Sequence, residues 1–154
     1  MIEIPNFKTM TITHIVCDYN GTIAKDGIVL PGIKALFEKL CKNYTLHVIT
    51  ADTFGSVHAQ LEGYGAQIKV LSSSDHTMEK AAFIADLGSD QCAAMGNGNN
   101  DSEMLRLAAV GIAVLGDEGC SKDALFSADM VCQNSGDALA LFLEPKRLIA
   151  TLRR

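Results

Sequence analysis

Short apolar runs alternate with segments of helical period along almost the whole chain, and this alternation limits the folds open to it. The runs that we interpret as strands are residues 11–17, 44–50, 66–70, 92–95, 110–114 and 128–132. Helical spacing of apolar side chains marks residues 32–42, 77–87, 102–108, 135–143 and 145–152. Strand followed by helix, repeated, predicts an α/β fold: a Rossmann-like parallel sheet with right-handed crossovers and flanking helices.

Two β-hairpins are expected beside this sheet. One lies near the N-terminus, around residues 2–10. The other is marked by Lys25-Asp26-Gly27, a sequence typical of a tight hairpin turn. It predicts a small flap just after the first strand of the sheet.

Length and composition limit the class of protein. A chain of 154 residues, 48% hydrophobic and 20% charged, is typical of a compact globule, and we expect one domain over residues 1–154. The formal net charge of −5 provides no basic surface for nucleic acid. No apolar stretch is long enough to span a bilayer, and a secretory signal pattern is absent. Five scattered cysteines without a Cys-x-x-Cys pair indicate reduced core residues, so we expect a cytoplasmic protein.

The stretch from Asp18 to Thr22 carries the first chemical signal. Asp18 ends an apolar run, and a Gly-Thr turn begins at Gly21. Open α/β sheets place reacting groups at the carboxyl ends of their strands, and a glycine lets backbone N–H groups of such a turn face an anion. A carboxylate in this place is suited to attack phosphorus. Two places after it stands Asn20, which has no proton to give or to take.

Three further polar landmarks follow, each at a predicted strand end, helix start or loop. Thr50 ends an apolar strand, so its hydroxyl and the N–H of Ala51 are expected to point into one crevice. Lys80 lies at the opening of the helix predicted over residues 77–87. The last landmark is the loop Gly96-Asn97-Gly98-Asn99-Asn100-Asp101, which follows a strand. Its glycines and oxygen-bearing side chains suit a hard cation together with a phosphate group.

Other polar residues are interpreted as structural. His14 and His47 lie inside predicted strands and have no metal-ligand spacing. Asn99 is interpreted as a turn former that tolerates left-handed backbone.

The four landmarks, in this order and spacing, resemble the haloacid dehalogenase superfamily of phosphohydrolases. The resemblance covers nearly the whole chain, from Asp18 to the closing strands. It is closest to the phosphorylation domain of P-type ATPases and to the soluble stand-alone relatives of that domain. Those pumps share the Gly-x-Gly-x-Asn-Asp loop, and the residue two places after their phosphorylated aspartate is likewise not an aspartate.

The resemblance implies a catalytic role for each landmark. Asp18 is the expected nucleophile, which forms an aspartyl-phosphate with Mg²⁺ shared between its carboxylate and the phosphate. Thr50, the N–H of Ala51 and the turn at Gly21 are expected to hold phosphate oxygens. Lys80 is expected to bind phosphate and to neutralise charge on Asp18 and on the phosphoryl group.

The same resemblance implies the metal ligands. They are the carboxylate of Asp18, the backbone carbonyl of Asn20, and Asn97, which stands where the family has a metal-binding aspartate. Asp101 either ligates Mg²⁺ through water or orients Lys80. Asn20 stands where phosphatases of the family usually carry their general acid/base aspartate. Because such a group contributes about 10²–10⁴-fold to the rate, slow turnover is expected.

The intervals between the landmarks leave no room for an inserted domain. Between Asp18 and Thr50 the chain holds only the flap and one helix, and between Thr50 and Lys80 only one helix and one strand. We therefore expect a capless member of the family, without a cap domain. Its mouth is open unless neighbouring subunits of a homo-oligomer, a dimer or a tetramer, cover it.

Two functions follow as hypotheses. The leading one is a Mg²⁺-dependent phosphatase or phosphotransferase, of the phosphoric monoester hydrolase type, which acts on a small phosphorylated substrate through Asp18. The alternative is a non-hydrolytic relative that retains the fold as a phosphate- or partner-binding module. The loss of two carboxylates, at Asn20 and Asn97, is compatible with either hypothesis.

Overall fold

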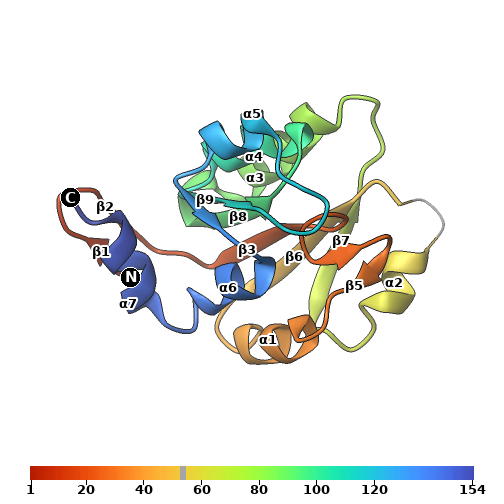
Figure 1. Cartoon of the computed structure of the whole chain (residues 1–154), viewed down its shortest axis with the longest axis horizontal. Helices are drawn as coiled ribbons and strands as arrows, with labels where there is room; N and C mark the ends of the chain where they lie inside the picture. The colour runs from red at the N-terminus through yellow and green to blue at the C-terminus, as the bar shows by residue number, and fades with distance from the viewer. Residues whose placement is uncertain (53–54) are drawn as a thin grey trace.

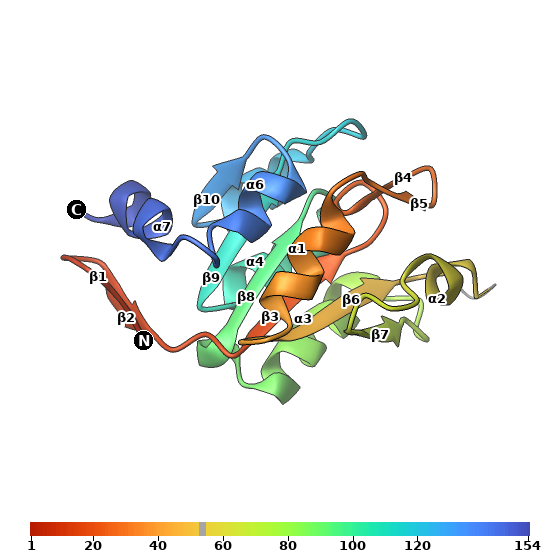
Figure 2. The same ribbon diagram turned by 90° about the horizontal axis from the view of Figure 1, so that it is seen from below.

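A six-stranded parallel sheet forms the centre of the computed structural model, which describes residues 1–52 and 55–154. Its strand order is β10-β9-β8-β3-β6-β7 (Figure 2). The strands are β3 (His14–Asp18), β6 (Thr45–Thr50), β7 (Ala66–Val70), β8 (Cys92–Gly96), β9 (Val110–Val114) and β10 (Met130–Cys132). Each pair of neighbours runs parallel, which confirms the predicted Rossmann-like α/β fold.

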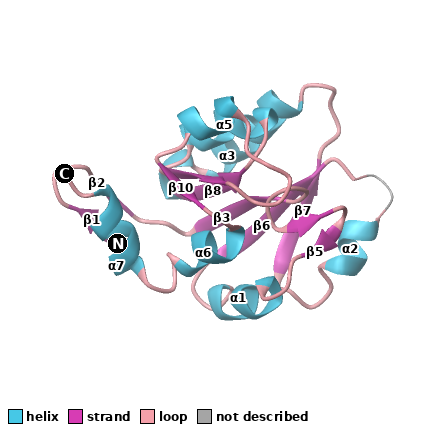
Figure 3. Cartoon of the chain, in the orientation of Figure 1, coloured by secondary structure: helices cyan, strands magenta, loops and turns pink. Residues whose placement is uncertain are grey.

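Helices cover both faces of this sheet (Figures 1 and 3). On one face lie α3 (His76–Leu87), α4 (Ser102–Leu107) and α5 (Lys122–Ser127), and on the other lie α1 (Ile33–Leu40) and α6 (Ser135–Ala140). The short helix α2 (Ser56–Gln60) lies between β6 and β7 in sequence, and two single-turn 3₁₀ segments precede β8 and α4. A chain whose crossovers alternate between the two faces buries both sides of its sheet.

The two ends of the chain pack together at one end of the molecule. Strands β1 (Ile2–Ile4) and β2 (Lys8–Met10) form the predicted N-terminal hairpin, and the last helix, α7 (Pro145–Leu152), lies beside it (Figure 2). The side-chain amide of Asn6 donates to the carbonyl oxygen of Arg154 over 2.9 Å. This pairing lies at the far end of the sheet from the flap.

Most predicted elements are confirmed, and one helix was missed. The bounds of β7 and of α7 agree with the prediction, whereas the first strand of the sheet begins only at His14. Helix α5 was not predicted because its apolar pattern is weak: Ala124 is its buried residue, while Phe126 is 72% exposed. The side chain of Ser121 caps this helix by accepting from the N–H of Ala124.

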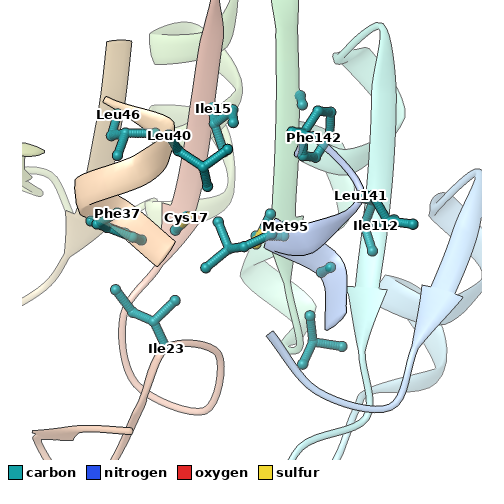
Figure 4. Close-up of a cluster of buried hydrophobic side chains, with 14 of the residues drawn as sticks. Ile15, Cys17, Ile23, Phe37, Leu40, Leu46, Met95, Ile112, Leu141 and Phe142 are labelled. Carbon is teal, nitrogen blue, oxygen red and sulfur yellow. The ribbon is translucent and has the colours of Figure 1, made fainter. Parts of the chain in front are cut away.

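Two hydrophobic clusters form the core, one on each face of the sheet. Ile15 and Cys17 of β3 point to the α1 side, where they pack with Phe37 (Figure 4). Val16, between them in sequence, points to the opposite cluster with Ile84 of α3. Since successive side chains of a strand alternate between the faces and both faces are covered, the buried positions 15–17 of β3 are all apolar, and the strand ends at Asp18.

His47, which is buried, and His14, which is half-buried, form a pair on the α3 face of the sheet. Their rings are joined by a 3.1 Å hydrogen bond between Nδ1 of His14 and Nε2 of His47. The ring of His47 also makes an edge contact with Phe83 of α3, with ring centroids 5.4 Å apart, and His47 is only 3% exposed. Burial, reinforced by the neighbouring His14, lowers the pKa of His47 from 6.5 to about 4.

This pair makes the stability of the fold depend on pH. Because the pKa of His47 is lower in the folded protein than in the unfolded chain, the unfolded chain binds the proton first as pH falls. The contribution of His47 to the free energy of unfolding is complete above about pH 6.5 and is lost as pH falls towards 4. We expect the free energy of unfolding to drop by about 1–2 kcal/mol between pH 7 and pH 5 from this group. Urea titrations of wild type and His47→Gln test it, since the variant should show a shallower pH dependence; equal slopes would contradict the expectation.

Candidate active site

The carboxyl ends of β3, β6 and β8 surround a cavity of about 280 Å³. All but one of the predicted site residues line it, namely Asp18, Asn20, Thr50, Ala51, Lys80, Asn97 and Asp101. The remaining one, Gly21, is not among the lining residues, and a Cβ atom there would collide with the Asn97 amide. The structure thus brings together residues that are far apart in sequence, while their chemical roles stay predictions.

Lys80 forms hydrogen bonds with three other residues of the site. Its ammonium group donates to Oδ1 of Asp18 over 2.9 Å, and to Oδ1 of Asp101 and Oδ1 of Asn100 over 2.8 Å each. An ammonium has three hydrogens, so these bonds use all of them. Lys80 starts from the first turns of α3, and its side chain is 3% exposed.

The charges in this cluster do not balance, because two carboxylates share one ammonium. Burial and, next to it, the charge of Asp101 raise the pKa of Asp18 to about 7, although Lys80 and Thr22 act in the opposite direction. Burial also disfavours the charge on Lys80, but the carboxylates of Asp18 and Asp101 outweigh it and raise the pKa of that ammonium. The excess negative charge is what a bound cation would neutralise.

Asp101 is fully buried, and both of its carboxylate oxygens have partners. Oδ1 accepts from Lys80, and Oδ2 accepts from the backbone N–H groups of Asn97 and Gly98 over 3.0 Å each. Of the two roles left open by the sequence, orienting Lys80 is the one that these contacts serve directly. A contact with Mg²⁺ through water stays a prediction.

Gly96 leaves the space that the Asp101 carboxylate occupies. A Cβ atom at Gly96 would collide with Cγ of Asp101, whereas one at Gly98 would keep 3.8 Å from the nearest carboxylate oxygen. We expect Gly96→Ala to displace Asp101 and to lower the free energy of unfolding by about 1–3 kcal/mol. The matched variant Gly98→Ala should stay within about 0.5 kcal/mol of wild type. Chemical denaturation measures both, and equal stability of the two variants would refute the packing argument.

Asn97 is held by its amide nitrogen, which donates to the backbone carbonyl of Gly119 over 3.0 Å. A carbonyl oxygen only accepts, so this contact assigns the orientation of the amide and turns Oδ1 towards Thr22. The hydroxyl of Thr22 lies 3.3 Å from Oδ1 of Asn97 and 3.2 Å from Oδ2 of Asp18. Two of the predicted metal ligands therefore converge on one point.

Thr22 and Asn100 are the residues whose contacts sequence reasoning missed. Thr22 belongs to the turn motif after Asp18, but its contact with Asn97 crosses 75 residues of chain. Asn100 belongs to the polar loop, and its bond to Lys80 is one that the sequence does not indicate. The residue type gave the only available signal, because serine, threonine and asparagine side chains suit both turns and ligand contacts.

Thr50 and Ala51 present hydrogen-bond donors at the end of β6. The hydroxyl oxygen of Thr50 accepts from the backbone N–H of Asp52 over 3.1 Å, which leaves its own hydrogen to donate. Thr50 is 4% exposed, and both residues line the cavity. This arrangement is able to hold the oxygens of an anion.

The flap is attached to the loop that carries the nucleophile candidate. Strands β4 (Ala24–Lys25) and β5 (Ile28–Val29) pair antiparallel, and the turn between them has positive φ at Asp26 and Gly27, as the predicted hairpin requires. The backbone N–H of Gly27 donates to Oδ1 of Asn20 over 3.0 Å, and the hydroxyl of Tyr19 donates to the Gly27 carbonyl over 2.7 Å. Both polar groups of one flap residue are thus bound by neighbours of Asp18.

The donor set of the cavity fits a hard cation. The polar atoms offered by Asp18, Asn97 and the backbone of Asn20 are oxygens, and neither histidine nor cysteine is among the described residues that line the cavity. Within residues 1–52 and 55–154, no group of three or more His, Cys, Asp or Glu side chains is placed to hold a metal ion. Oxygen ligands of this kind suit Mg²⁺ and do not suit zinc.

Comparison with known proteins finds sequence relatives of part of this chain. Residues 75–137 match the family model of the haloacid dehalogenase-like hydrolases. An uncharacterised protein of Methanocaldococcus jannaschii is 48% identical over 60 residues, which make up 39% of this chain and 64% of that protein. The matched region therefore spans less than two thirds of the curated relative.

Solved structures share the fold over nearly the full length. The 3-deoxy-D-manno-octulosonate 8-phosphate phosphatase from Moraxella catarrhalis, solved with magnesium, phosphate and KDO, has a TM-score of 0.72 at 17% identity; 92% of this chain and 94% of that chain are covered. Residues 75–137 thus resemble the haloacid dehalogenase-like hydrolases in sequence, and the chain has a fold like that of this phosphatase. A zinc-transporting PIB-type ATPase also matches, with a TM-score of 0.64 at 21% identity over 80% of this chain and 20% of that one.

Residues 1–52 and 55–154 contain no cap domain. The flap and α1 fill the interval from Asp18 to Thr50, and α2 and β7 lie between Thr50 and Lys80. None of the helices in residues 1–52 and 55–154 has the length and apolar character needed to cross a membrane.

Proposed function

We propose that this protein is a Mg²⁺-dependent phosphatase or phosphotransferase that forms an aspartyl-phosphate on Asp18. The observation that carries the proposal is the buried contact of Asp18 with Lys80, which is itself held by Asp101, at the carboxyl end of β3. The Moraxella catarrhalis phosphatase, which binds magnesium and phosphate on a similar fold, supports it. The proposed substrate is a small phosphorylated compound, and a cavity of about 280 Å³ accommodates its phosphoryl group.

In the proposed reaction, a carboxylate oxygen of Asp18 attacks phosphorus and the bond from phosphorus to the leaving group breaks. The hydroxyl of Thr50 and the N–H of Ala51 hold the phosphoryl oxygens in place, and the ammonium charge of Lys80 offsets the negative charge on Asp18 and on the phosphoryl group. Mg²⁺, bound by Asp18, Asn97 and the backbone carbonyl of Asn20, would supply additional positive charge at the phosphoryl group. Water then attacks the aspartyl-phosphate and restores Asp18.

Phosphoenzyme trapping tests the proposal against the alternative of a phosphate- or partner-binding module. Purified protein is incubated with Mg²⁺ and a small acyl phosphate, quenched in acid and examined by intact-protein mass spectrometry. An added phosphoryl group that peptide mapping places on Asp18 supports the enzyme. Binding of phosphate without any covalent adduct or phosphate release would favour the module.

Metal removal should stop the reaction. Since Asp18 and Asp101 are the carboxylates that line the site, we expect Mg²⁺ to bind weakly and to be removed by excess chelator. Phosphate release should then fall to background and return when Mg²⁺ is added, but not when Zn²⁺ is added. Isothermal titration calorimetry measures the binding itself. Full activity in excess chelator would rule out the metal-dependent mechanism.

A cytoplasmic location and a homo-oligomer, a dimer or a tetramer, are also part of the proposal. The open mouth and the flap residue Ile28, which is 63% exposed, support the oligomer, because a neighbouring subunit would cover both.

A further inference from the structure

We propose that the leaving group of the substrate departs unprotonated, as a weakly basic anion, and that the substrate class is an acyl phosphate, the mixed anhydride of a carboxylic acid and phosphoric acid. This inference rests on the proposed function and names the substrate class of the same site. It follows from the proton donors of the cavity and from the charges beside it.

None of the described residues that line the cavity is an acid available to protonate a leaving group. Asp18 is the nucleophile, and both oxygens of Asp101 already accept hydrogen bonds from Lys80 and from the backbone. Lys80 has committed its three hydrogens. The hydroxyl of Tyr19 donates to the flap carbonyl of Gly27. Among the described lining residues, histidine, glutamate and cysteine are absent.

Asn20 offers a hydrogen bond in place of a proton. Its Oδ1 is bound by the Gly27 N–H, so the orientation of the amide is set by the flap. This leaves Nδ2 as the end of the amide that is able to bind a substrate oxygen, and Asn20 lines the cavity. An amide donor stabilises negative charge on a departing oxygen without protonating it. It therefore favours a leaving group that is stable as an anion and gives little help to an alkoxide.

The available positive charge favours an acyl phosphate over a polyphosphate as the substrate. Lys25 of the flap pairs with Asp117 over 3.4 Å, and Lys69 of β7 pairs with Glu79 over 3.9 Å. Lys80 is shared by two carboxylates. Neither Lys25 nor Lys69 is among the described residues that line the cavity. Lys80 does line it, but two carboxylates already hold its ammonium, so the described lining offers no further ammonium to a second or third phosphate group. A nucleoside triphosphate would bring charges that the site does not match.

The reaction balances without any other co-reactant. A carboxylate oxygen of Asp18 bonds to phosphorus, the bond from phosphorus to the acyl oxygen breaks, and its electron pair leaves with a carboxylate. No proton moves in this step. Water then attacks phosphorus, the bond from phosphorus to Asp18 breaks, and both hydrogens of the water end on the released dihydrogen phosphate.

A substrate series tests this inference. The values of kcat/KM for acetyl phosphate, glycerol 1-phosphate and adenosine triphosphate are measured by phosphate release at saturating Mg²⁺, with p-nitrophenyl phosphate as the reference. The kcat/KM for acetyl phosphate should exceed that for glycerol 1-phosphate by about 10²–10⁴-fold more than their uncatalysed rates differ. This factor is the contribution of a general acid, which the alkyl phosphate needs and the site lacks. The kcat/KM for acetyl phosphate should also exceed that for adenosine triphosphate.

Two variants separate the effect of the Asn20 Nδ2 donor from the effect of the flap hydrogen bonds. Asn20→Ala removes the Nδ2 donor together with a flap bond and should lower kcat/KM for acetyl phosphate by about 10–10²-fold. Tyr19→Phe removes the other flap bond and keeps the donor, so it should lose clearly less. Equal losses in the two variants would assign the effect to the flap and overturn the role of Nδ2.

The outcomes distinguish this inference from the proposed function. One outcome is that glycerol 1-phosphate or adenosine triphosphate is turned over as fast as acetyl phosphate, with a phosphoenzyme on Asp18. That result would overturn the acyl phosphate as substrate class and would still support the proposed enzyme. No turnover of any of the four compounds and no phosphoenzyme would overturn both.

Discussion

Replacement of Asp18 by asparagine is expected to abolish turnover and phosphoenzyme formation together. The amide cannot attack phosphorus, and no other carboxylate of the cavity is free to replace it, since both oxygens of Asp101 are bound. Loss of a covalent nucleophile typically costs several orders of magnitude, so we expect at least about a 10⁴-fold decrease in kcat. Steady-state phosphate release and acid-quenched mass spectrometry measure the two effects.

The control for this variant is a second exchange of aspartate for asparagine. Asp26 lies in the flap turn, where its φ of 52° is one that asparagine also tolerates, and its side chain is exposed. Asp26→Asn should retain wild-type turnover. The melting temperature of Asp18→Asn should equal or exceed that of wild type, because the variant removes one of two carboxylates that share Lys80. Turnover that survives Asp18→Asn in a folded protein would overturn the nucleophile assignment.

Replacement of Asn20 by aspartate is expected to increase activity towards ordinary alkyl phosphates. A carboxyl group at this position is able to protonate the leaving oxygen and then to activate water, which contributes about 10²–10⁴-fold, or about 3–5.5 kcal/mol of barrier. It also accepts the N–H of Gly27 as Asn20 does, so the flap keeps its attachment. Glycerol 1-phosphate should gain most, and acetyl phosphate should gain less at the transfer step because its leaving group needs no proton.

The other lost carboxylate provides the matched control. Asn97→Asp also adds one negative charge, but it removes the amide donor to Gly119 and places a carboxylate oxygen against that carbonyl. We therefore expect no comparable gain in kcat from Asn97→Asp. Both expectations are tested by steady-state turnover of wild type and the two variants, on one substrate with a poor leaving group and one with a good leaving group. An unchanged or lower rate in folded Asn20→Asp would mean that the site uses another base or is not hydrolytic.

The order of elements was predictable because it depends on short-range patterns. The apolar run that ends at Asp18 and the helical spacing before Lys80 are visible within a few residues of sequence. Once the sheet is parallel, the carboxyl ends of its strands meet at one edge, so the meeting of Asp18, Thr50 and Asn97 follows from topology. Helix α5 escaped prediction because Ala124 is its buried residue and gives no period.

The contacts inside the site were not predictable, because they join residues that the chain keeps far apart. Lys80 reaches Asp18 across 62 residues and Asp101 across 21, and no local pattern encodes which oxygen it meets. The use of both Asp101 oxygens depends on the space left by Gly96. The sequence named Asn97 as a lost carboxylate, but only the structure reveals that its amide is bound to Gly119.

The sequence by itself determined the parallel α/β fold, the flap and most of the residues that line the site, since strand and helix periods and turn residues act over a few positions. The tertiary structure alone decided that Lys80 serves three oxygens and that the flap holds the Asn20 amide. The reason is physical: hydrogen bonds have a short range and a strict direction, so their partners are chosen only when packing has placed the loops.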